Sequence, residues 1–160
     1  MKVERKLNAS IFHIVVNTNK HISNVDPEYM NDFYEGSIHV FKTNIFKYIE
    51  AYAGREEDNK HLREFIQSID VTIAREIGKQ DQKFHLDITV NIKHKTKLRF
   101  KQHMIREFFD NLNTYLYNKK KGDNMYHKCH IDIRGFADQA FYSKQYTEKG
   151  GDFESFNVDV

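Results

Sequence analysis

The stretch from Phe84 to Ile92 alternates between apolar and polar side chains more regularly than any other part of the chain. The apolar positions are Phe84, Leu86, Ile88, Val90 and Ile92, and the polar positions between them are His85, Asp87, Thr89 and Asn91. Successive side chains of a β-strand point to opposite faces of a sheet, so this pattern predicts a strand with one apolar face and one polar face. The fold must therefore contain a sheet whose apolar side is covered.

The residues around this strand predict further strands and several helices. Strands are expected at residues 10–17, 71–77 and 128–134, where β-branched and aromatic residues gather. Helices are expected from Pro27 onward with Asp26 as N-cap, around Leu62, Phe65, Ile66 and Ile69, over 99–116, and over 137–149. Strands joined by short loops favour antiparallel pairing. We therefore predict an α+β fold with helices packed on a central antiparallel sheet.

Length and composition exclude several classes of protein. The 160 residues suit a single domain over 1–160, and the 39% hydrophobic content excludes a disordered tail. No apolar run is long enough to cross a membrane, and the N-terminal residues lack the apolar segment of a secretory signal, so we expect a protein that is not secreted and has no membrane partner. Cys129 is the only cysteine, which excludes an internal disulfide framework and a four-cysteine zinc site. The net charge of +2 does not by itself indicate a nucleic-acid binder.

His85 and Asp87 lie two residues apart on the alternating strand and therefore share a face. Glu76 ends the preceding predicted strand on the polar side, and its carboxylate reaches the same point if the two strands pair across the loop at 78–82. A set of one nitrogen and several carboxylate oxygens suits Mg²⁺ or Mn²⁺ better than a structural zinc ion. The alternative is an ordinary solvated strand face, and the His-Ile-Asp sequence at 130–132 repeats the same spacing.

Tyr146 and Lys149, three residues apart, share one face of the last predicted helix. A tyrosine can act as a covalent nucleophile, and a phenolate that attacks phosphorus forms a phosphotyrosine ester. Lys149 is then a candidate for positioning the phosphate or for transferring a proton. Tyr142 lies one helical turn earlier and is a rival nucleophile. The alternative is a surface tyrosine and lysine at a helix end.

Two polar segments supply candidate contacts to DNA. Asn17 and Asn19 lie at the end of the first predicted strand, and Lys119, Lys120 and Lys121 form a basic loop. Lysines of this kind can neutralise phosphate charge without reading base sequence. The alternative for the lysines is a solvated loop with no partner.

In their order along the chain these motifs resemble those of the HUH-type replication initiator (Rep) endonucleases, above all the Reps of small circular single-stranded DNA viruses. Residues 12–19 resemble the first motif of the family, and His85-Leu86-Asp87 resembles its second, a His-hydrophobe-His or His-hydrophobe-Gln strand. The third motif is a helix-borne Tyr-x-x-Lys, which residues 146–149 resemble. Glu76 matches a glutamate that often completes the metal set. The likeness runs from about Ser10 to Phe153.

The resemblance implies a fold and an activity. The fold would be a central antiparallel sheet of about five strands with flanking helices, related to the RNA-recognition fold. Glu76, His85 and Asp87 would hold Mn²⁺ or Mg²⁺. Tyr146 would nick single-stranded DNA at an origin stem-loop, leaving a 5′-phosphotyrosine and a free 3′-hydroxyl from which rolling-circle replication starts. Viral Reps generally act in the host nucleus, and a protein that is not viral would be expected in the cytoplasm.

The chain departs from that family at three points. Asp87 stands where the family usually has His or Gln, and the segment from Val25 to Ser68 is long for a connection between the first two strands. The Gly-x-x-x-x-Gly-Lys phosphate loop of a helicase domain is missing from the sequence. We therefore expect either an excised nuclease domain, with a helicase domain or homo-oligomer in the full-length protein, or a shorter relative. Two other classes stay open, namely a non-catalytic RNA-recognition-like module that stacks bases on exposed aromatic residues, and a structural or assembly protein.

Overall fold

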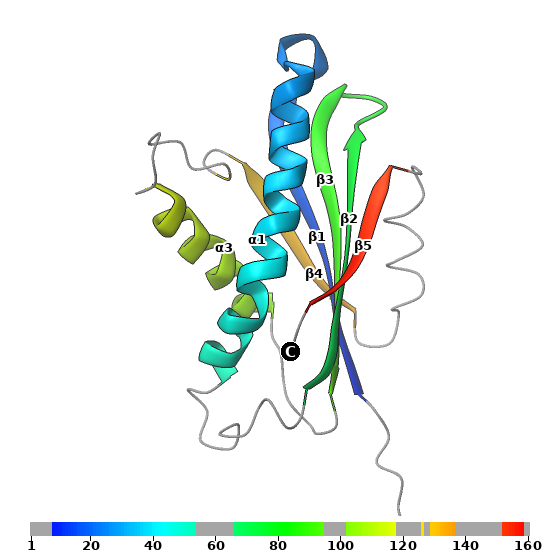
Figure 1. Ribbon diagram of the computed structural model, residues 1–160. Helices are drawn as coiled ribbons and strands as arrows, with labels where there is room; N and C mark the ends of the chain where they lie inside the picture. The colour runs from blue at the N-terminus through cyan, green and yellow to red at the C-terminus, as the bar shows by residue number, and fades with distance from the viewer. Residues whose placement is uncertain are drawn as a thin grey trace, which may run out of the picture.

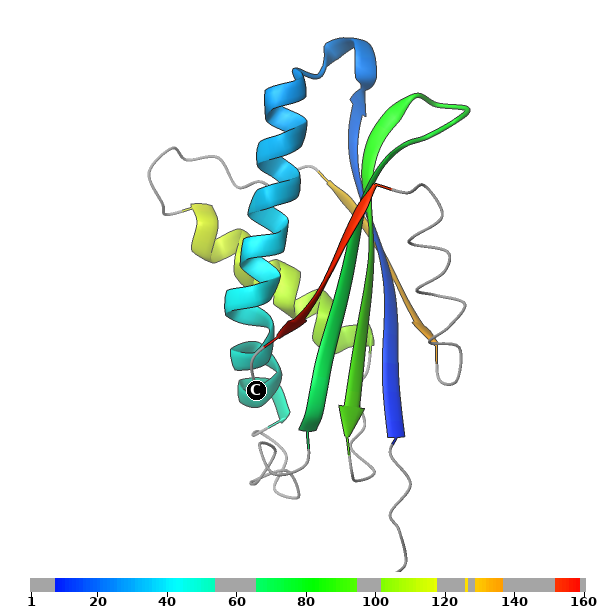
Figure 2. The same cartoon turned by 45° about the vertical axis from the view of Figure 1, so that its right-hand side comes forward.

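The structure, a computed structural model, describes residues 8–53, 66–94, 102–117, 126, 129–136 and 152–158. The elements in these residues are β1 (Asn8–His21), η1 (Ile22–Asn24), α1 (Pro27–Ala53), β2 (Ile66–Ile77), β3 (Lys83–His94), α3 (Gln102–Tyr117), β4 (His130–Phe136) and β5 (Phe153–Val158). The strands form a five-stranded sheet in the order β4-β1-β3-β2-β5, and every neighbouring pair is antiparallel. Helices α1 and α3 cover one face of this sheet (Figures 1 and 2). The predicted α+β fold is confirmed.

The central strand β3 has the alternation that its sequence predicts. Its five apolar side chains are at most 1% exposed and belong to the core beneath α1 and α3. Burial of large aliphatic and aromatic side chains is the main favourable term in folding, about 1.5–3 kcal/mol for each. The apolar stripe of β3 therefore fixes which face of the sheet receives the helices, and it leaves His85 and Asp87 on the opposite face.

The helices follow from capping and from apolar spacing. Asp26 Oδ1 accepts a hydrogen bond from the backbone N–H of Glu28 at 2.9 Å, so the predicted N-cap before Pro27 is confirmed. Buried aromatic side chains of the two helices meet over the sheet, with the Phe41 and Phe108 ring centroids 5.4 Å apart. Neither helix, within the part of the chain that is described, combines the length and the apolarity needed to cross a bilayer.

The helix predicted around Leu62, Phe65, Ile66 and Ile69 is wrong for the two residues that the structure describes. Ile66 and Ile69 lie in β2, where both are buried although they are three residues apart. An irregularity in the pairing with β3 between Ile66 and Ser68 turns both side chains to the core. A β-bulge thus produced a spacing that looks helical. Leu62 and Phe65 lie outside the described residues.

One predicted strand also needs correction, and one strand of the sheet was not predicted. β4 begins at His130 and continues through Gly135 to Phe136, because its pairing with β1 extends past the glycine to Ile11. β5 was not predicted at all. It pairs with β2 from Ala74 to Ile69, and Ser155 Oγ lies 2.8 Å from Thr72 Oγ1 across that pair. Only Val158 of β5 is buried, so this edge strand has little apolar pattern to reveal it.

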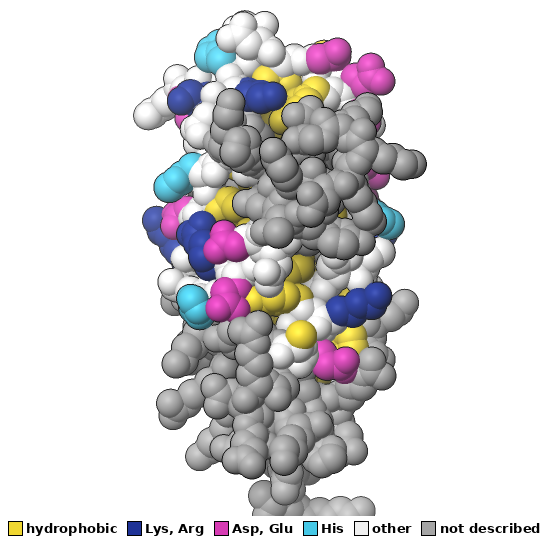
Figure 3. Space-filling view, turned by 90° about the vertical axis from the view of Figure 1, so that its left-hand side faces the viewer, with side chains coloured by type: hydrophobic (Ala, Val, Ile, Leu, Met, Phe, Trp, Pro, Cys, Tyr) yellow, Lys and Arg dark blue, Asp and Glu magenta, His cyan; other side chains and the backbone are white. Residues whose placement is uncertain are grey.

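The helix-bearing side of the molecule carries mixed charge. Seen from the left of Figure 1, its coloured side chains intersperse basic, acidic and histidine groups with apolar ones (Figure 3). The coloured side chains in this view do not form a continuous patch of positive charge, so they provide no extended surface for a phosphate backbone there.

Candidate metal centre

Three side chains with metal-ligating groups meet on the sheet face opposite the helices. His85 and Asp87 stand side by side on β3, and Glu76 of β2 pairs directly with His85. His85 Nε2 lies 3.2 Å from Glu76 Oε2 and 3.6 Å from Asp87 Oδ2. One ligand atom from each residue falls within 4.8 Å of the others. The structure therefore brings together the three residues that the sequence nominated, and we call them the carboxylate–histidine group.

A tight turn sets this register. Residues 78–82, a predicted loop, reverse the chain between β2 and β3, with the Gly78 N–H donating to the Lys83 carbonyl at 2.9 Å. Asp81 Oδ1 accepts from the Lys83 N–H at 3.0 Å and fills the space beside Gly78, where a Cβ would lie only 2.0 Å from it. Glycine is the residue that leaves room for this carboxylate, and the turn holds Glu76 opposite His85.

The face that carries the group is not an ordinary solvated strand surface. Asp87 is 2% exposed and Thr89 is 3% exposed, although both are polar. Glu76 and His85 are half-buried and lie nearer the end of the strand pair. Burying a charged carboxylate is costly unless it is paired, so the surroundings of Asp87 must compensate its charge. This burial contradicts the alternative of an ordinary solvated strand face at Asp87 and Thr89.

His13 of β1 is a neighbour that the sequence analysis did not single out. Its Nε2 lies 3.6 Å from Asp87 Oδ1, and the residue is 7% exposed. Asp87 thus contacts His13 through one oxygen and His85 through the other. The signal in the sequence was a lone histidine in an otherwise apolar strand, on the same parity as Asn17. If Asp87 serves as a ligand, a neighbour that holds its carboxylate in this way would orient it toward the metal.

The electrostatics of the group match its geometry. Burial, together with the nearby Asp87 carboxylate, raises the pKa of Glu76 from 4.5 to about 7. Contact with Asp87 outweighs burial and raises the pKa of His85 from 6.5 to about 8. Burial opposes ionisation of Asp87, but contacts with His13, His85 and Glu76 hold the pKa of this carboxyl well below its usual range. At neutral pH a protonated His85 therefore lies between two acidic residues.

The protein without bound metal should become less stable as the pH rises from about 4.5 to about 8. The raised pKa of Glu76 adds stability that is complete below pH 4.5 and is lost as the pH rises through about 7. The raised pKa of His85 adds stability that is complete below pH 6.5 and is lost as the pH rises through about 8. Thermal unfolding in EDTA across this range measures the effect as a falling Tm.

The Glu76→Gln protein is the control for that experiment. In this protein the Tm should fall less steeply between about pH 4.5 and pH 7, because the contribution of the Glu76 carboxyl to the pH dependence is removed. Mn²⁺ should raise the Tm of the unaltered protein more at about pH 8 than at lower pH, because metal and protons compete for the same atoms. The same slope in both proteins would show that Glu76 does not carry a displaced pKa.

The repeated His-Ile-Asp sequence on β4 lies in a different environment. His130 and Asp132 pair with Asn17 and Val15 of β1, so the adjacent strand offers no carboxylate opposite them. Asp132 instead contacts Arg134, with Oδ2 and Nε 3.5 Å apart. Among the described residues, the carboxylate–histidine group is the only such cluster of three. Glu76 on the neighbouring strand therefore distinguishes the carboxylate–histidine group from the His-Ile-Asp sequence on β4.

The remaining candidate residues divide into two sets. Asn17 is half-buried and pairs with His85, and its Oδ1 accepts from the backbone N–H of Asn19 at 2.9 Å. Asn19 is exposed and has a φ of 59°. Asn17 thus lies beside the group and Asn19 beyond it. The other candidates lie outside the described residues, and these are Tyr142, Tyr146, Lys149, Lys119, Lys120 and Lys121.

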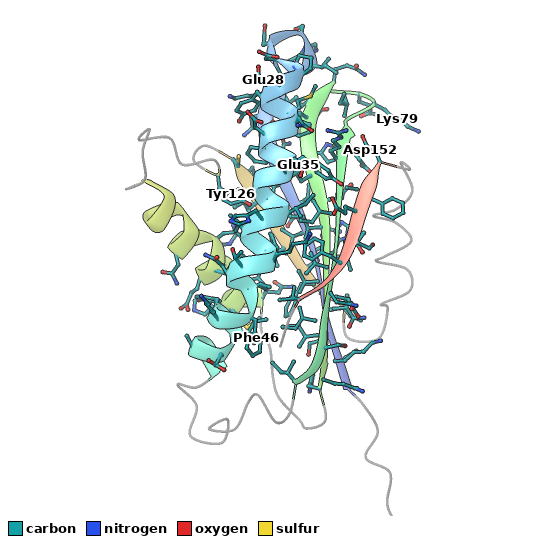
Figure 4. The ribbon with its side chains drawn as sticks, viewed as in Figure 1. Glu28, Glu35, Phe46, Lys79, Tyr126 and Asp152 are labelled. Carbon is teal, nitrogen blue, oxygen red and sulfur yellow. The ribbon has the colours of Figure 1, made fainter. Side chains whose placement is uncertain are left out.

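Glu76 also borders an open pocket of about 340 Å³ at the same end of the sheet. The pocket is lined by Pro27, Met30, Arg75, Glu76, Ile77, Phe84 and Asp152. Arg75 and Asp152 of this lining form an ion pair of 2.7 Å. Asp152 lies toward the end of the sheet that carries the Lys79 turn (Figure 4). Most of the lining comes from α1 and from the helix-bearing side of β2 and β3, so the pocket lies on the side of the sheet opposite the carboxylate–histidine group.

The donor set of the group suits a divalent cation. An imidazole nitrogen and two carboxylates provide both the charge and the atom types that such ions prefer, and oxygen donors favour Mg²⁺ or Mn²⁺. No protein-family model and no curated protein matches the chain.

Proposed function

We propose that this protein is a metal-dependent endonuclease and strand transferase that nicks and rejoins single-stranded DNA through a 5′-phosphotyrosine intermediate. The observation that carries the proposal is the carboxylate–histidine group on the face of an antiparallel sheet, with its ligand atoms within 4.8 Å of one another. The motif order that resembles the Rep endonucleases supports the choice of DNA as substrate. We also propose that the protein nicks DNA at an origin stem-loop and that the nick starts rolling-circle replication.

Glu76, His85 and Asp87 would hold the cation, Mn²⁺ or Mg²⁺. A bound cation supplies positive charge that polarises the scissile phosphate. The protein supplies the ligand atoms. The turn at 78–82 and the pairing of β2 with β3 hold these atoms in place. His13 keeps one oxygen of Asp87 engaged, which leaves the other facing His85.

The covalent chemistry falls to the Tyr146 phenol. Its oxygen attacks phosphorus, the bond from phosphorus to the 3′-oxygen breaks, and the products are a 5′-phosphotyrosine and a 3′-hydroxyl. The phenol proton must be removed and the departing 3′-oxygen must gain one, and Lys149 is the proposed proton donor or phosphate-positioning group. The reverse attack by a 3′-hydroxyl rejoins the strand. If the chain is viral, the host nucleus is the proposed place of action.

A labelled single-stranded hairpin incubated with the protein and Mn²⁺ tests the proposal. We expect a band of protein joined to DNA that survives denaturant, and we expect EDTA to abolish it. A mobility shift without this adduct would instead indicate a non-catalytic RNA-recognition-like module. Neither a shift nor an adduct on any hairpin of a randomised loop library would contradict both functions and favour a structural protein.

A further inference from the structure

Phe153, the first residue of β5, places an aromatic ring on the sheet face that carries the carboxylate–histidine group. It pairs with Ala74, and Ala74 pairs with Asp87, so the three residues form one row across β5, β2 and β3. The hydroxyl contact between Ser155 and Thr72 confirms that this parity of β5 faces away from the helices. Its neighbours of opposite parity, Glu154 and Phe156, contact Lys42 of α1.

The exposure of this ring is unusual for the molecule. In the described part of the chain only two large hydrophobic residues are exposed, Phe153 and Ile77, each at 39%. A single exposed apolar residue needs no explanation by itself. Phe153, however, is the aromatic one of the pair and lies on the same face as the carboxylate–histidine group. Strands in a sheet are about 4.8 Å apart, so its Cα is about 10 Å from that of Asp87.

We propose that Phe153 is a stacking platform for a base of single-stranded DNA whose nearby phosphate lies at the carboxylate–histidine group. The methyl group of Ala74 is the only side chain between Phe153 and Asp87 in their row. Aromatic rings stack on any base and therefore hold a strand without reading its sequence. This inference rests on the proposed function and adds to it a site for the base. It also predicts the path of the DNA strand, which would cross β2 from the carboxylate–histidine group toward β5 at the edge of the sheet.

The described charges next to Phe153 are already paired, which favours a neutral base over a phosphate at this position. Asp152 and Glu154 flank Phe153 in sequence, and both are exposed. Asp152 is paired with Arg75 at 2.7 Å, and Glu154, of the opposite parity to Phe153, lies 3.9 Å from Lys42 of α1. Both cations are therefore engaged by carboxylates, whereas a base can lie on the ring while its backbone continues toward the carboxylate–histidine group.

The test compares Phe153→Leu with Phe153→Tyr and with Ile77→Ala in binding to a fluorescent single-stranded oligodeoxynucleotide that contains 2-aminopurine. All proteins carry Tyr146→Phe, and binding is measured in Mn²⁺ and in EDTA. We expect Phe153→Leu to bind about tenfold more weakly in Mn²⁺, the order expected for the loss of one base stack. We expect Phe153→Tyr to restore both the affinity and the quenching of 2-aminopurine. Ile77→Ala, equally exposed but on the other side of β2, should change neither.

The salt dependence of binding separates stacking from charge. Loss of a phosphate contact lowers the slope of log Kd against log salt by about 1, whereas loss of a stack leaves the slope unchanged. Unchanged affinity and quenching in Phe153→Leu would overturn this inference. If the unaltered chain still forms the covalent adduct with DNA, the proposed function stands without the platform. Binding that depends on Phe153 without any adduct would overturn the proposed function and keep the platform. No binding to single-stranded DNA would overturn both.

Discussion

The Asp87→Asn protein is expected to lose Mn²⁺-dependent cleavage of single-stranded DNA by at least about 100-fold. Loss of a residue that only supports a metal ligand costs about 10- to 100-fold in affinity or activity, and Asp87 is proposed as a ligand itself. Asparagine keeps the shape of the side chain but removes the charge, and Asp87 is the most buried member of the group. The measurement is the rate of adduct formation at a fixed Mn²⁺ concentration.

Asp132→Asn is the matched control for this variant. Asp132 stands in the same His-Ile-Asp spacing on β4, but it faces Arg134 rather than a second carboxylate. It should cleave DNA at the rate of the unaltered protein. Equal losses in the two variants would point to a general effect of removing negative charge, and full activity in Asp87→Asn would exclude a role for this residue at the metal.

The Tyr146→Phe protein should form no covalent adduct with DNA while it still binds DNA. The phenol oxygen is the proposed attacking atom, and phenylalanine lacks it. In the same proposal, binding relies on the sheet face and on basic residues, which this change leaves intact. Denaturing electrophoresis detects the adduct, and fluorescence anisotropy measures the binding.

Tyr142→Phe is the companion variant, because Tyr142 is the rival nucleophile. We expect it to retain the adduct. An adduct in Tyr146→Phe that disappears on adding Tyr142→Phe would move the attacking oxygen to Tyr142. An adduct that persists in the double variant would end the proposal of a tyrosine nucleophile at these positions.

The parts of the fold that the sequence predicted are those set by local patterning. The alternation of β3 specifies one buried face over nine residues, from Phe84 to Ile92, and the structure buries every apolar position of it. β5 escaped prediction because an edge strand buries few side chains, and its sequence Phe-Glu-Ser-Phe-Asn-Val shows no clean alternation. The spacing of Ile66 and Ile69 at the start of β2 predicts a helix, because a register irregularity places both side chains on one face.

The same division holds for the candidate site. His85 and Asp87 share a face by the geometry of any strand, and Glu76 joins them through a short hairpin, so local rules sufficed. His13 and Phe153 reach the site only through the pairing of β1 with β3 and of β5 with β2. Those registers depend on contacts between residues far apart in the chain, which a local pattern does not encode.

Titration of the protein with Mn²⁺, followed by the electron paramagnetic resonance signal of the free ion, tests the central claim most directly. The claim is that Glu76, His85 and Asp87 together hold a divalent cation. We expect a single ion to bind per chain, to bind more tightly as the pH rises through about 7 to 8, and to be lost in Asp87→Asn but kept in Asp132→Asn. Binding of the same strength in all three proteins, or none in the unaltered protein, would contradict the claim.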